Sequence, residues 1–263
     1  MEQANNSSWG VLSGEQYTRL LYTVSVHHAR KIALLLLLRS PIWAGDTVPA
    51  TTLHWSDGTP SCTLRHADDG RTYYGVTSTD FEITLGVVTQ ELEKVRHRTI
   101  PMIGVLVSFK YKGTEPLALA PNRSTLEFVK HFQIVQRALD PSTMLQQLQQ
   151  NMDDLTDEIE RHQVRKHPEL KDAKESELQQ RLKDYTEMMD FISTQAMRDG
   201  TLDPSNASTT GWIFFSTKNR WIGPWRRPEQ FVFRIPIENT IVEFPFELPP
   251  KDEKIQLRRR PGE

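Results

Sequence analysis

The sequence predicts a mainly β protein, an antiparallel β-sandwich into which an antiparallel helical hairpin is inserted. Apolar and polar residues alternate in several short stretches, which is the pattern of strands with one buried face. These stretches do not alternate regularly with helical ones, which argues against the parallel sheet of an α/β protein. One central segment changes to a heptad-like spacing that is typical of paired helices.

Length and composition limit the classes of protein to consider. The chain has 263 residues, enough for one or two domains with a hydrophobic core. Its net charge of −2 excludes a globally basic nucleic-acid binder, although local basic patches remain open. Its single cysteine, Cys62, excludes an internal disulfide framework and a zinc site built from several thiolates.

The N-terminal segment is interpreted as a leader with a signal-like core. The apolar run Ile32–Leu38 has seven residues, whereas a membrane-spanning helix needs about 20. This length suits the core of a signal peptide, with Arg30-Lys31 before it and Ala44 at a position that favours cleavage. We therefore expect a periplasmic or secreted protein. The alternative is a cytoplasmic protein in which the run is a buried helix or strand.

Turn and strand patterns follow the leader. Two Asp-Gly steps, Asp57-Gly58 and Asp69-Gly70, suit turns with positive φ and predict hairpin connections. Strands are predicted where apolar residues alternate, over Phe81–Val87 and more strongly over Ile103–Tyr111. A further stretch has four apolar residues of one parity, Leu126, Phe128, Phe132 and Ile134.

The central segment is predicted to be an antiparallel helical hairpin. Asp140-Pro141 is a preferred helix start, with Asp as N-cap and Pro at the first helical position. His167-Pro168 interrupts the pattern, and Asp199-Gly200 ends it. The alternative is one long kinked helix that pairs with another subunit. Two seams have apolar residues at spacings of three and four: Leu145, Leu148, Met152, Leu155 and Ile159, and then Leu178, Leu182, Tyr185, Met189 and Ile192.

The strand pattern returns after the helical segment. Trp212–Phe215 is a continuous apolar run, which predicts a strand covered on both faces. Alternation predicts two more strands, over Phe231–Ile237 and Val242–Leu248. Pro236 and Pro245 fall inside these two strands, and each removes a backbone donor. We therefore expect both strands to lie at a sheet edge or to contain a bulge.

These strands resemble the immunoglobulin-like β-sandwich domains of exported bacterial proteins. The resemblance rests on the Ile103–Tyr111 strand, the Leu117–Leu126 connection around Pro121-Asn122, and the strands at Trp212–Phe215 and Phe231–Leu248, about half of the chain. It implies a fold class and transfers no functional residue. The predicted segments are a leader (1–44), the first part of the sandwich (45–140), the helical hairpin (141–198), the second part of the sandwich (199–250) and a charged tail (251–263).

The sequence predicts no catalytic residue, metal site or cofactor. It contains no glycine-flanked nucleophilic serine, phosphate-binding loop, dinucleotide fingerprint or His-Glu-x-x-His run. Asp68-Asp69-Gly70 lacks the alternating acidic ligands of a calcium loop. Cys62 and His66 fall on one face of a strand, but about 13 Å apart, too far for proton transfer.

The most distinctive local cluster is the stretch Lys218–Arg227, which we call the Trp/Arg loop. It has four cations and two indoles within ten residues, and Gly223-Pro224 favours a loop. Arginine stacks on indole, and both residue types are frequent in binding surfaces. The alternative is a structural loop that covers one end of the sandwich. The predicted contact residues are Arg220, Trp221, Trp225, Arg226 and Arg227.

Together these features predict a non-catalytic, exported binding or scaffold module. The expected partner is a protein or a glycan, because the net charge argues against nucleic acid. The sequence offers no membrane-spanning segment, and its helical seams favour oligomerisation. Two alternatives stay open. One is a hydrolase of the cell envelope with dispersed catalytic residues, and the other is a cytoplasmic adaptor that oligomerises through the heptad seams.

Overall fold

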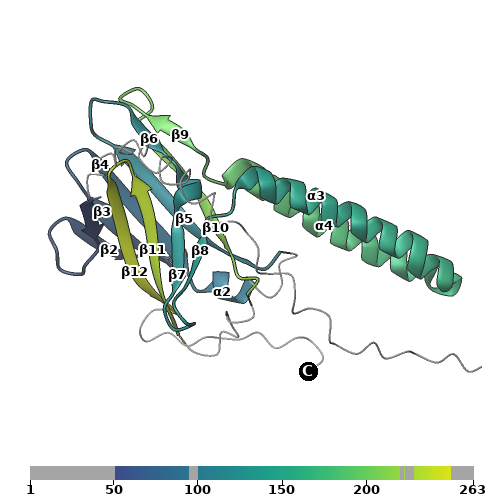
Figure 1. The fold of residues 1–263 in the computed structure, drawn as a ribbon. Helices are drawn as coiled ribbons and strands as arrows, with labels where there is room; N and C mark the ends of the chain where they lie inside the picture. The colour runs from purple at the N-terminus through teal and green to yellow at the C-terminus, as the bar shows by residue number, and fades with distance from the viewer. Residues whose placement is uncertain (1–50, 95–99, 220–221, 223–227, 250–263) are drawn as a thin grey trace, which may run out of the picture. The chain divides into compact units, whose positions relative to one another are not determined.

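The fold comes from a computed structural model of the chain. All the described residues belong to one compact unit. The predicted leader (1–44) and charged tail (251–263) lie outside the described residues. The described part is mainly β, with two sheets in a sandwich-like arrangement and inserted helices (Figure 1). The structure describes residues 51–94, 100–219, 222 and 228–249.

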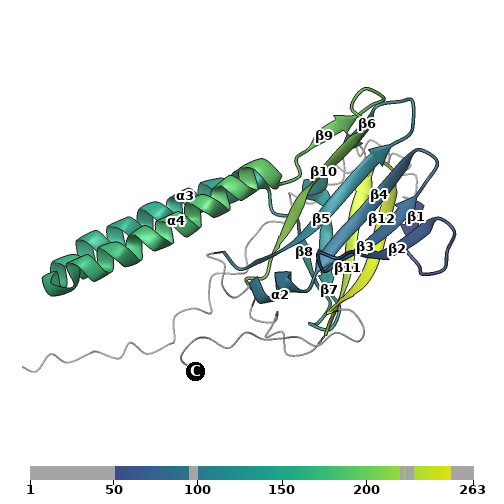
Figure 2. The same ribbon diagram turned by 180° about the vertical axis from the view of Figure 1, so that it is seen from behind.

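A five-stranded sheet is antiparallel throughout, in the order β10-β5-β4-β3-β2 (Figure 2). Its longest pairing joins β5 and β10 over nine residue pairs. The predicted Asp69-Gly70 turn is confirmed, since Gly70 has φ +77° between β2 and β3. The strands are β2 (Cys62–His66), β3 (Arg71–Thr77), β4 (Phe81–Val88), β5 (Met102–Tyr111) and β10 (Ser208–Ser216).

A seven-stranded sheet covers the other side of the core. β1 is parallel to β12, and all the other pairings in this sheet are antiparallel. The strand β11 is central, with β12 on one side and both β6 and β7 on the other. The strands are β1 (Thr51–His54), β6 (Leu117–Leu119), β7 (Thr125–Phe128), β8 (Ile134–Arg137), β9 (Gly200–Leu202), β11 (Glu229–Ile237) and β12 (Thr240–Leu248).

The two strand prolines have different environments. The predicted edge position is wrong for β11, which is an interior strand. Pro236 falls in the gap between the pairing of β11 with β7, which ends at Arg234, and its pairing with β6 at Ile237. Because β11 pairs with neither β6 nor β7 at this position, the missing N–H of the proline removes no hydrogen bond to these strands. Pro245 lies beyond Thr240–Glu243, the part of β12 that pairs with β1, and so has the predicted edge position.

One predicted hairpin is wrong because tertiary structure overrides the local turn signal. The Asp57-Gly58 turn is not a hairpin, since it connects β1 to β2 and these strands belong to different sheets. The stretch with apolar residues of one parity around Phe132 forms two strands, β7 and β8. Phe132 and Gln133 form the turn between them, with φ values of 58° and 52°, and the Phe132 side chain is 78% exposed.

The main core fills the space between the two sheets. Its side chains come from the alternating apolar positions of both sheets, as the period-two pattern predicts. Aromatic rings contact one another across it: Phe215 and Phe233, on different sheets, have ring centroids 6.0 Å apart in an edge-to-face arrangement. Six phenylalanines of this core are at most 1% exposed: Phe109, Phe128, Phe215, Phe231, Phe233 and Phe244.

The helical insertion, residues 141–195, lies in the chain between β8 and β9. Its first helix, α3 (Pro141–Asp157), begins at the predicted cap and continues into a π-helical segment, Glu158–Val164. After a 3₁₀ turn at Pro168–Leu170, α4 (Lys171–Gln195) follows. The two helices contact each other and lie side by side (Figure 1). No helix among the described residues has the length and apolar character that crossing a bilayer requires.

A second, smaller core joins the insertion to the five-stranded sheet. The predicted strand with two covered faces is confirmed in β10: Ile213 and Phe215 belong to the main core, and Phe214 packs with the helices. The short helix α2 (Gln90–Lys94) lies between β4 and β5 in the chain. The buried residues of the second core come from β5, β10, α3 and α4: Met102, Met144, Leu148, Tyr185, Ile192 and Phe214.

Candidate binding site at the root of the helical insertion

Both ends of the insertion are attached to the same edge of β10. The other edge of this strand is paired with β5. The Leu139 N–H donates to the Phe214 carbonyl, and the Met197 N–H donates to the Trp212 carbonyl, both over 2.8 Å. Phe214 and Trp212 are two residues apart, so the ends of the insertion are held about 7 Å apart along the strand. The insertion therefore has a narrow root, and it covers an edge that would otherwise be open.

The insertion begins at a carboxylate that caps α3. Asp140 Oδ2 accepts hydrogen bonds from the backbone N–H of Thr143 (2.8 Å) and from its hydroxyl (2.9 Å). These bonds, the backbone bond first, hold the pKa of Asp140 below its ordinary value. The positive charge of Arg198 acts in the same direction. Asp140 is therefore a carboxylate at neutral pH, at the N-terminus of a helix.

The insertion ends in a segment that runs close against β10. The Arg198 guanidinium donates to the Ser193 carbonyl in the last turn of α4 (3.2 Å), and Asp199 accepts from the amide of Asn122 (2.7 Å). Gly211 of β10 permits this close approach, because a Cβ atom there would lie 2.8 Å from the Met197 Cα and N atoms. Any other residue at position 211 would force the two backbones apart.

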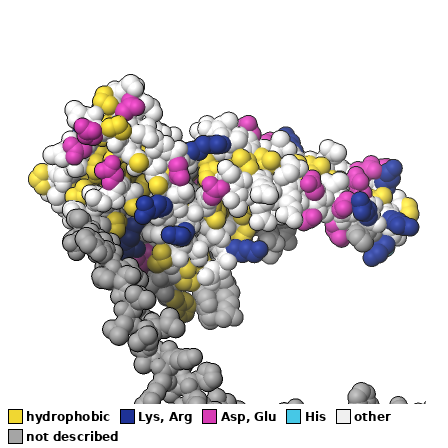
Figure 3. Space-filling model, turned by 45° about the horizontal axis from the view of Figure 1, so that its top comes forward, with side chains coloured by type: hydrophobic (Ala, Val, Ile, Leu, Met, Phe, Trp, Pro, Cys, Tyr) yellow, Lys and Arg dark blue, Asp and Glu magenta, His cyan; other side chains and the backbone are white. Residues whose placement is uncertain are grey.

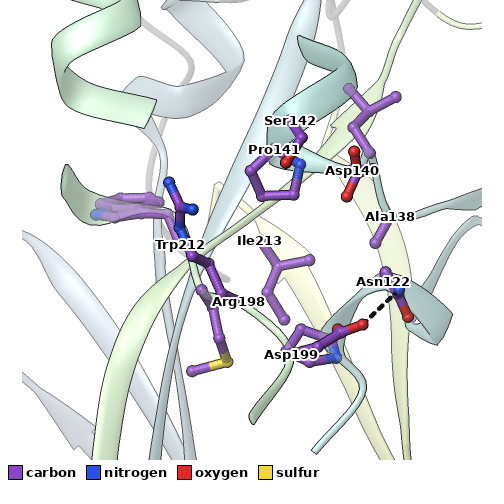
Figure 4. A pocket seen from close by; sticks show the side chains of 12 residues that line it. Asn122, Ala138, Asp140, Pro141, Ser142, Arg198, Asp199, Trp212 and Ile213 are labelled. Atoms are coloured by element: carbon purple, nitrogen blue, oxygen red, sulfur yellow. Dashed lines mark hydrogen bonds between the residues drawn. The ribbon is translucent and has the colours of Figure 1, made fainter. Parts of the chain in front are cut away.

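These segments enclose a cavity of about 250 Å³, which we call the junction pocket (Figure 4). Asn122 and Asp199 lie at one side, joined by their hydrogen bond, and Arg198 lies beside the Trp212 ring at the other. Asp140 lies where α3 begins. The pocket thus brings together two carboxylates, one guanidinium, an amide and an indole from segments far apart in the sequence.

The chemistry of the junction pocket suits binding. Its charged groups can hold a small polar molecule or a polar side chain, and Trp212 and Ile213 supply apolar surface. The described residues that line it include neither cysteine nor histidine, so these residues offer no pair of a nucleophile and an imidazole base. No group of three or more metal-ligating side chains occurs within the described ranges.

The predicted contact residues of the Trp/Arg loop, Arg220, Trp221, Trp225, Arg226 and Arg227, lie outside the described residues. Three neighbours within the loop are described. Ile222 is partly buried against the main core, and its N–H donates to the Asn219 carbonyl over 3.0 Å. Lys218, near the end of β10, is exposed. The role of the loop in binding stays a prediction.

The structure divides the predicted seam residues into two groups. Five are buried: Leu148, Ile159, Leu178, Tyr185 and Ile192. The other five stay partly exposed: Leu145, Met152, Leu155, Leu182 and Met189. Figure 3 shows apolar side chains along the part of the insertion nearest the sheets, whereas charged side chains gather toward its far end.

Cys62 and His66 do not meet, as the sequence predicts. Both belong to β2, but their side chains have different neighbours. The Cys62 sulfur lies 4.0 Å from the His54 carbonyl oxygen, and the His66 ring is 3.1 Å from the Thr72 hydroxyl. The structure therefore supports no nucleophile–base pair at this position.

Sequence reasoning did not identify the junction pocket. It assigned Asp140 as a helix cap and Asp199-Gly200 as a helix stop, but it did not place them in one site. The useful signal was that charged residues flank both ends of the insertion, Asp140 at one end and Arg198-Asp199 at the other. Their meeting depends on where both ends attach to β10, which is a long-range contact.

No protein-family model, curated protein or solved structure matches this chain. The geometry of the described residues is therefore the basis for assigning a function.

Proposed function

We propose that this chain is a non-catalytic, exported binding or scaffold module whose helical insertion binds a protein partner. The observation that carries the proposal is the partial exposure of the seam. Leu145, Met152, Leu155, Leu182 and Met189 stay partly exposed although α3 and α4 contact each other. Four of these residues, Leu145, Met152, Leu155 and Met189, also pack against the second core. Apolar residues that stay partly exposed on a helix pair are typical of an interaction surface.

The charge of α3 indicates which kind of protein surface would complement the insertion. The helix has three aspartates, Asp153, Asp154 and Asp157, and no lysine or arginine over residues 141–157. We infer that the partner presents an apolar helical face flanked by basic residues, because such a surface complements both the seam and its charge. The narrow root on β10 supports this proposal, since it holds the insertion at a defined place on the sandwich.

We infer that α3 and α4 form an antiparallel, coiled-coil-like hairpin and that the two sheets have an immunoglobulin-like topology. The contact between the helices and the short connection between them, residues 167–170, support the hairpin. Mostly antiparallel strands around one shared core support the sandwich class.

Export is proposed from sequence alone. The apolar core Ile32–Leu38 and the cleavage position at Ala44 are the features that support it. Mass spectrometry of the protein purified from its native cell would identify the first residue of the mature form. A start just after Ala44 is expected, and a product that retains residues 1–44 would contradict export.

A deletion of the insertion tests the proposed binding role. Replacing residues 141–195 by a linker of about four Gly and Ser residues spans the short distance between the two attachment points. We expect the deleted protein to keep its sheets, measured by circular dichroism, and to lose a partner that the full chain captures and binds again after both are purified. Equal binding by the two forms would contradict the proposal.

Two point variants of α4 locate the contact more closely. The double variant Leu182→Gln with Met189→Gln changes partly exposed seam residues, and Glu187→Gln changes an exposed residue of the same helix as the control. We expect the double variant to weaken binding by about tenfold or more, and the control variant to bind as the unaltered chain does.

Oligomerisation through the same seam is a second candidate function. The same five partly exposed residues favour it, because another copy of the insertion offers matching apolar surface. Light scattering at increasing protein concentration separates the two candidates. A molecular mass that rises with concentration, and falls to the monomer value in the Leu182→Gln, Met189→Gln variant, would favour self-association over a different partner.

A further inference from the structure

The outer face of the five-stranded sheet carries a row of residues that crosses all five strands. In register from β2 to β10 the row reads Arg65, Tyr73, Gly86, Leu106 and Trp212. These residues face away from the main core, because their chain neighbours Tyr74, Leu85, Val107 and Ile213 point into it. We call this row and the hydroxyl row beside it the sheet platform.

Glycines allow the aromatic rings of the platform to lie close against the strands. A Cβ atom at Gly86 would be only 2.9 Å from the Tyr73 ring. A Cβ atom at Gly104 would be 3.0 Å from the rings of both Trp212 and Phe214. Two central strands therefore lack side chains where neighbouring rings lie over them. Of these rings, those of Tyr73 and Trp212 are partly exposed, whereas that of Phe214 is buried in the second core.

Each of the two outer rings has an arginine over it. The Arg65 Cζ atom lies 4.5 Å from the centre of the Tyr73 ring, and the Arg71 Cζ atom lies 5.8 Å from the Trp212 ring. Arg71 is paired with Asp69, whereas exposed Arg65 forms no ion pair with another described residue. A guanidinium stacked on a ring keeps its donors in a fixed plane, ready for a carboxylate or sulfate group.

Hydroxyl groups form the next row on the same face. Its residues in register are Thr63, Gly75, Thr84, Ser108 and Thr210, so that four of the five strands contribute a hydroxyl. The hydroxyls of Ser108 and Thr210 are 2.8 Å apart. With a strand spacing of about 4.8 Å, the row is about 19 Å long. Hydroxyls both donate and accept hydrogen bonds, as the hydroxyls of sugars do.

We propose that the sheet platform binds an acidic saccharide chain. The partly exposed apolar surface of Leu106 suits the C–H face of a sugar ring, and the hydroxyl row suits its hydroxyl groups. Arg65 supplies the charge that a carboxylate or sulfate on the saccharide requires. Trp212 lies against Phe191 of α4, with ring centroids 5.9 Å apart, so the platform borders the insertion on β10, whereas Arg65 on β2 lies at the opposite edge of the sheet.

A single-stranded nucleic acid fits the platform less well. Nucleic-acid grooves follow the backbone with several cations, because each nucleotide carries a phosphate. On this face Arg71 is paired with Asp69, and Lys112 is paired with Glu82 over 3.2 Å. Among the described residues, this face thus offers exposed Arg65 and Lys110 beside the four hydroxyls of the platform, which matches a saccharide whose charges are widely spaced.

Calorimetric titration of the full chain with three probes tests the proposal. The probes are an oligogalacturonate as acidic saccharide, dextran as neutral saccharide and an oligothymidylate as nucleic acid. We expect binding of the oligogalacturonate only. Arg65→Gln is expected to weaken it by about tenfold or more, whereas Arg137→Gln, at an exposed arginine of β8 in the other sheet, leaves it unchanged.

Two Tyr73 variants examine the ring beneath Arg65. Tyr73→Phe keeps the stacked ring and is expected to keep binding, and Tyr73→Ala removes the ring and is expected to weaken binding about as much as Arg65→Gln does. Circular dichroism reports whether Tyr73→Ala folds. If this variant does not fold, the binding of oligogalacturonate by Arg65→Gln tests the proposal alone. Unchanged oligogalacturonate binding by Arg65→Gln, absence of oligogalacturonate binding, or tighter binding of oligothymidylate would each overturn the proposal.

Discussion

The two hydrophobic cores of the molecule differ in the parts of the structure that they hold together. The main core contains side chains of both sheets, including Phe233 and Phe244, whereas the second core has six buried residues where the insertion meets the five-stranded sheet. The strand β10 serves both, with Ile213 and Phe215 on one face and Phe214 on the other. The difference indicates that the helices need the sheet for burial, while the sheets meet each other without the helices.

Truncation of the main core gives the largest expected effect. Phe233 is fully buried, with Phe215 and Phe244 as ring neighbours at 6.0 and 6.2 Å. We expect Phe233→Ala to lower the free energy of unfolding by about 3–5 kcal/mol, measured by urea denaturation, because it leaves a cavity where a ring packed. Val232→Ala, at the next and partly exposed position, is the control. A loss confined to the helices would contradict the comparison.

Truncation of the second core is expected to have a more local effect. Ile192 is fully buried, and its change to Ala costs about 2–5 kcal/mol in the contacts that hold the insertion. Hydrogen exchange is expected to become faster in peptides of residues 141–195, with little change in β11 and β12. Glu187→Ala, exposed on the same helix, is the control. Equal loss of protection in both regions would show that the two cores unfold as one unit.

Alkaline pH is expected to weaken the main core through Tyr74. Burial, with a smaller contribution from Glu247, raises the pKa of Tyr74 to about 12. The folded state therefore favours the neutral phenol. This contribution is complete below the ordinary tyrosine pKa of about 10, and it is lost as the pH rises toward 12. Phenolate absorbance and circular dichroism, followed together, measure the effect.

The matched variant for this titration is Tyr74→Phe, which keeps the ring beside Trp55 at a centroid distance of 4.9 Å. We expect the loss of stability between pH 10 and 12 to be smaller in this variant, because the titrating group is absent. The same loss in both proteins would assign it to other residues.

The smallest expected effect comes from the cap at the root of the insertion. Asp140→Ala removes the oxygen that accepts from Thr143 and is expected to destabilise α3 by about 1 kcal/mol. Asp140→Asn keeps a capping oxygen and serves as the control. Faster hydrogen exchange in the first turn of α3 is the readout. Identical exchange in the Ala and Asn variants would indicate that the cap does not hold the root.

The sequence predicted those features that depend on neighbouring residues. Asp140-Pro141 begins a helix, Ile103–Tyr111 falls within a strand, and Trp212–Phe215 belongs to a strand covered on both faces. It failed where a contact joins distant parts of the chain. The interior position of β11 follows from β6 and β7, which lie about a hundred residues before it.

The candidate sites also depend on contacts between distant parts of the chain, which the sequence did not predict. Asp140 and Asp199 enter one pocket only because both ends of the insertion attach to β10. Arg65 and Trp212 enter one row only through the register of five strands. Periodicity identifies which residues face outward on each strand, but it does not identify their partners on the next strand. The Trp/Arg loop was a local pattern, and its contact residues lie outside the described ones.

The attachment of the insertion to β10 also determines how a mechanical load would travel. The chain reaches the insertion from β8 and leaves it toward β9, both in the seven-stranded sheet, yet its two ends are bonded to β10 of the five-stranded sheet. A pull on the helices therefore first strains the Leu139 and Met197 hydrogen bonds and the second core. The nine residue pairs between β10 and β5 come under tension only later. Under such a load, the root is therefore expected to detach from β10 before the strands of the sandwich separate.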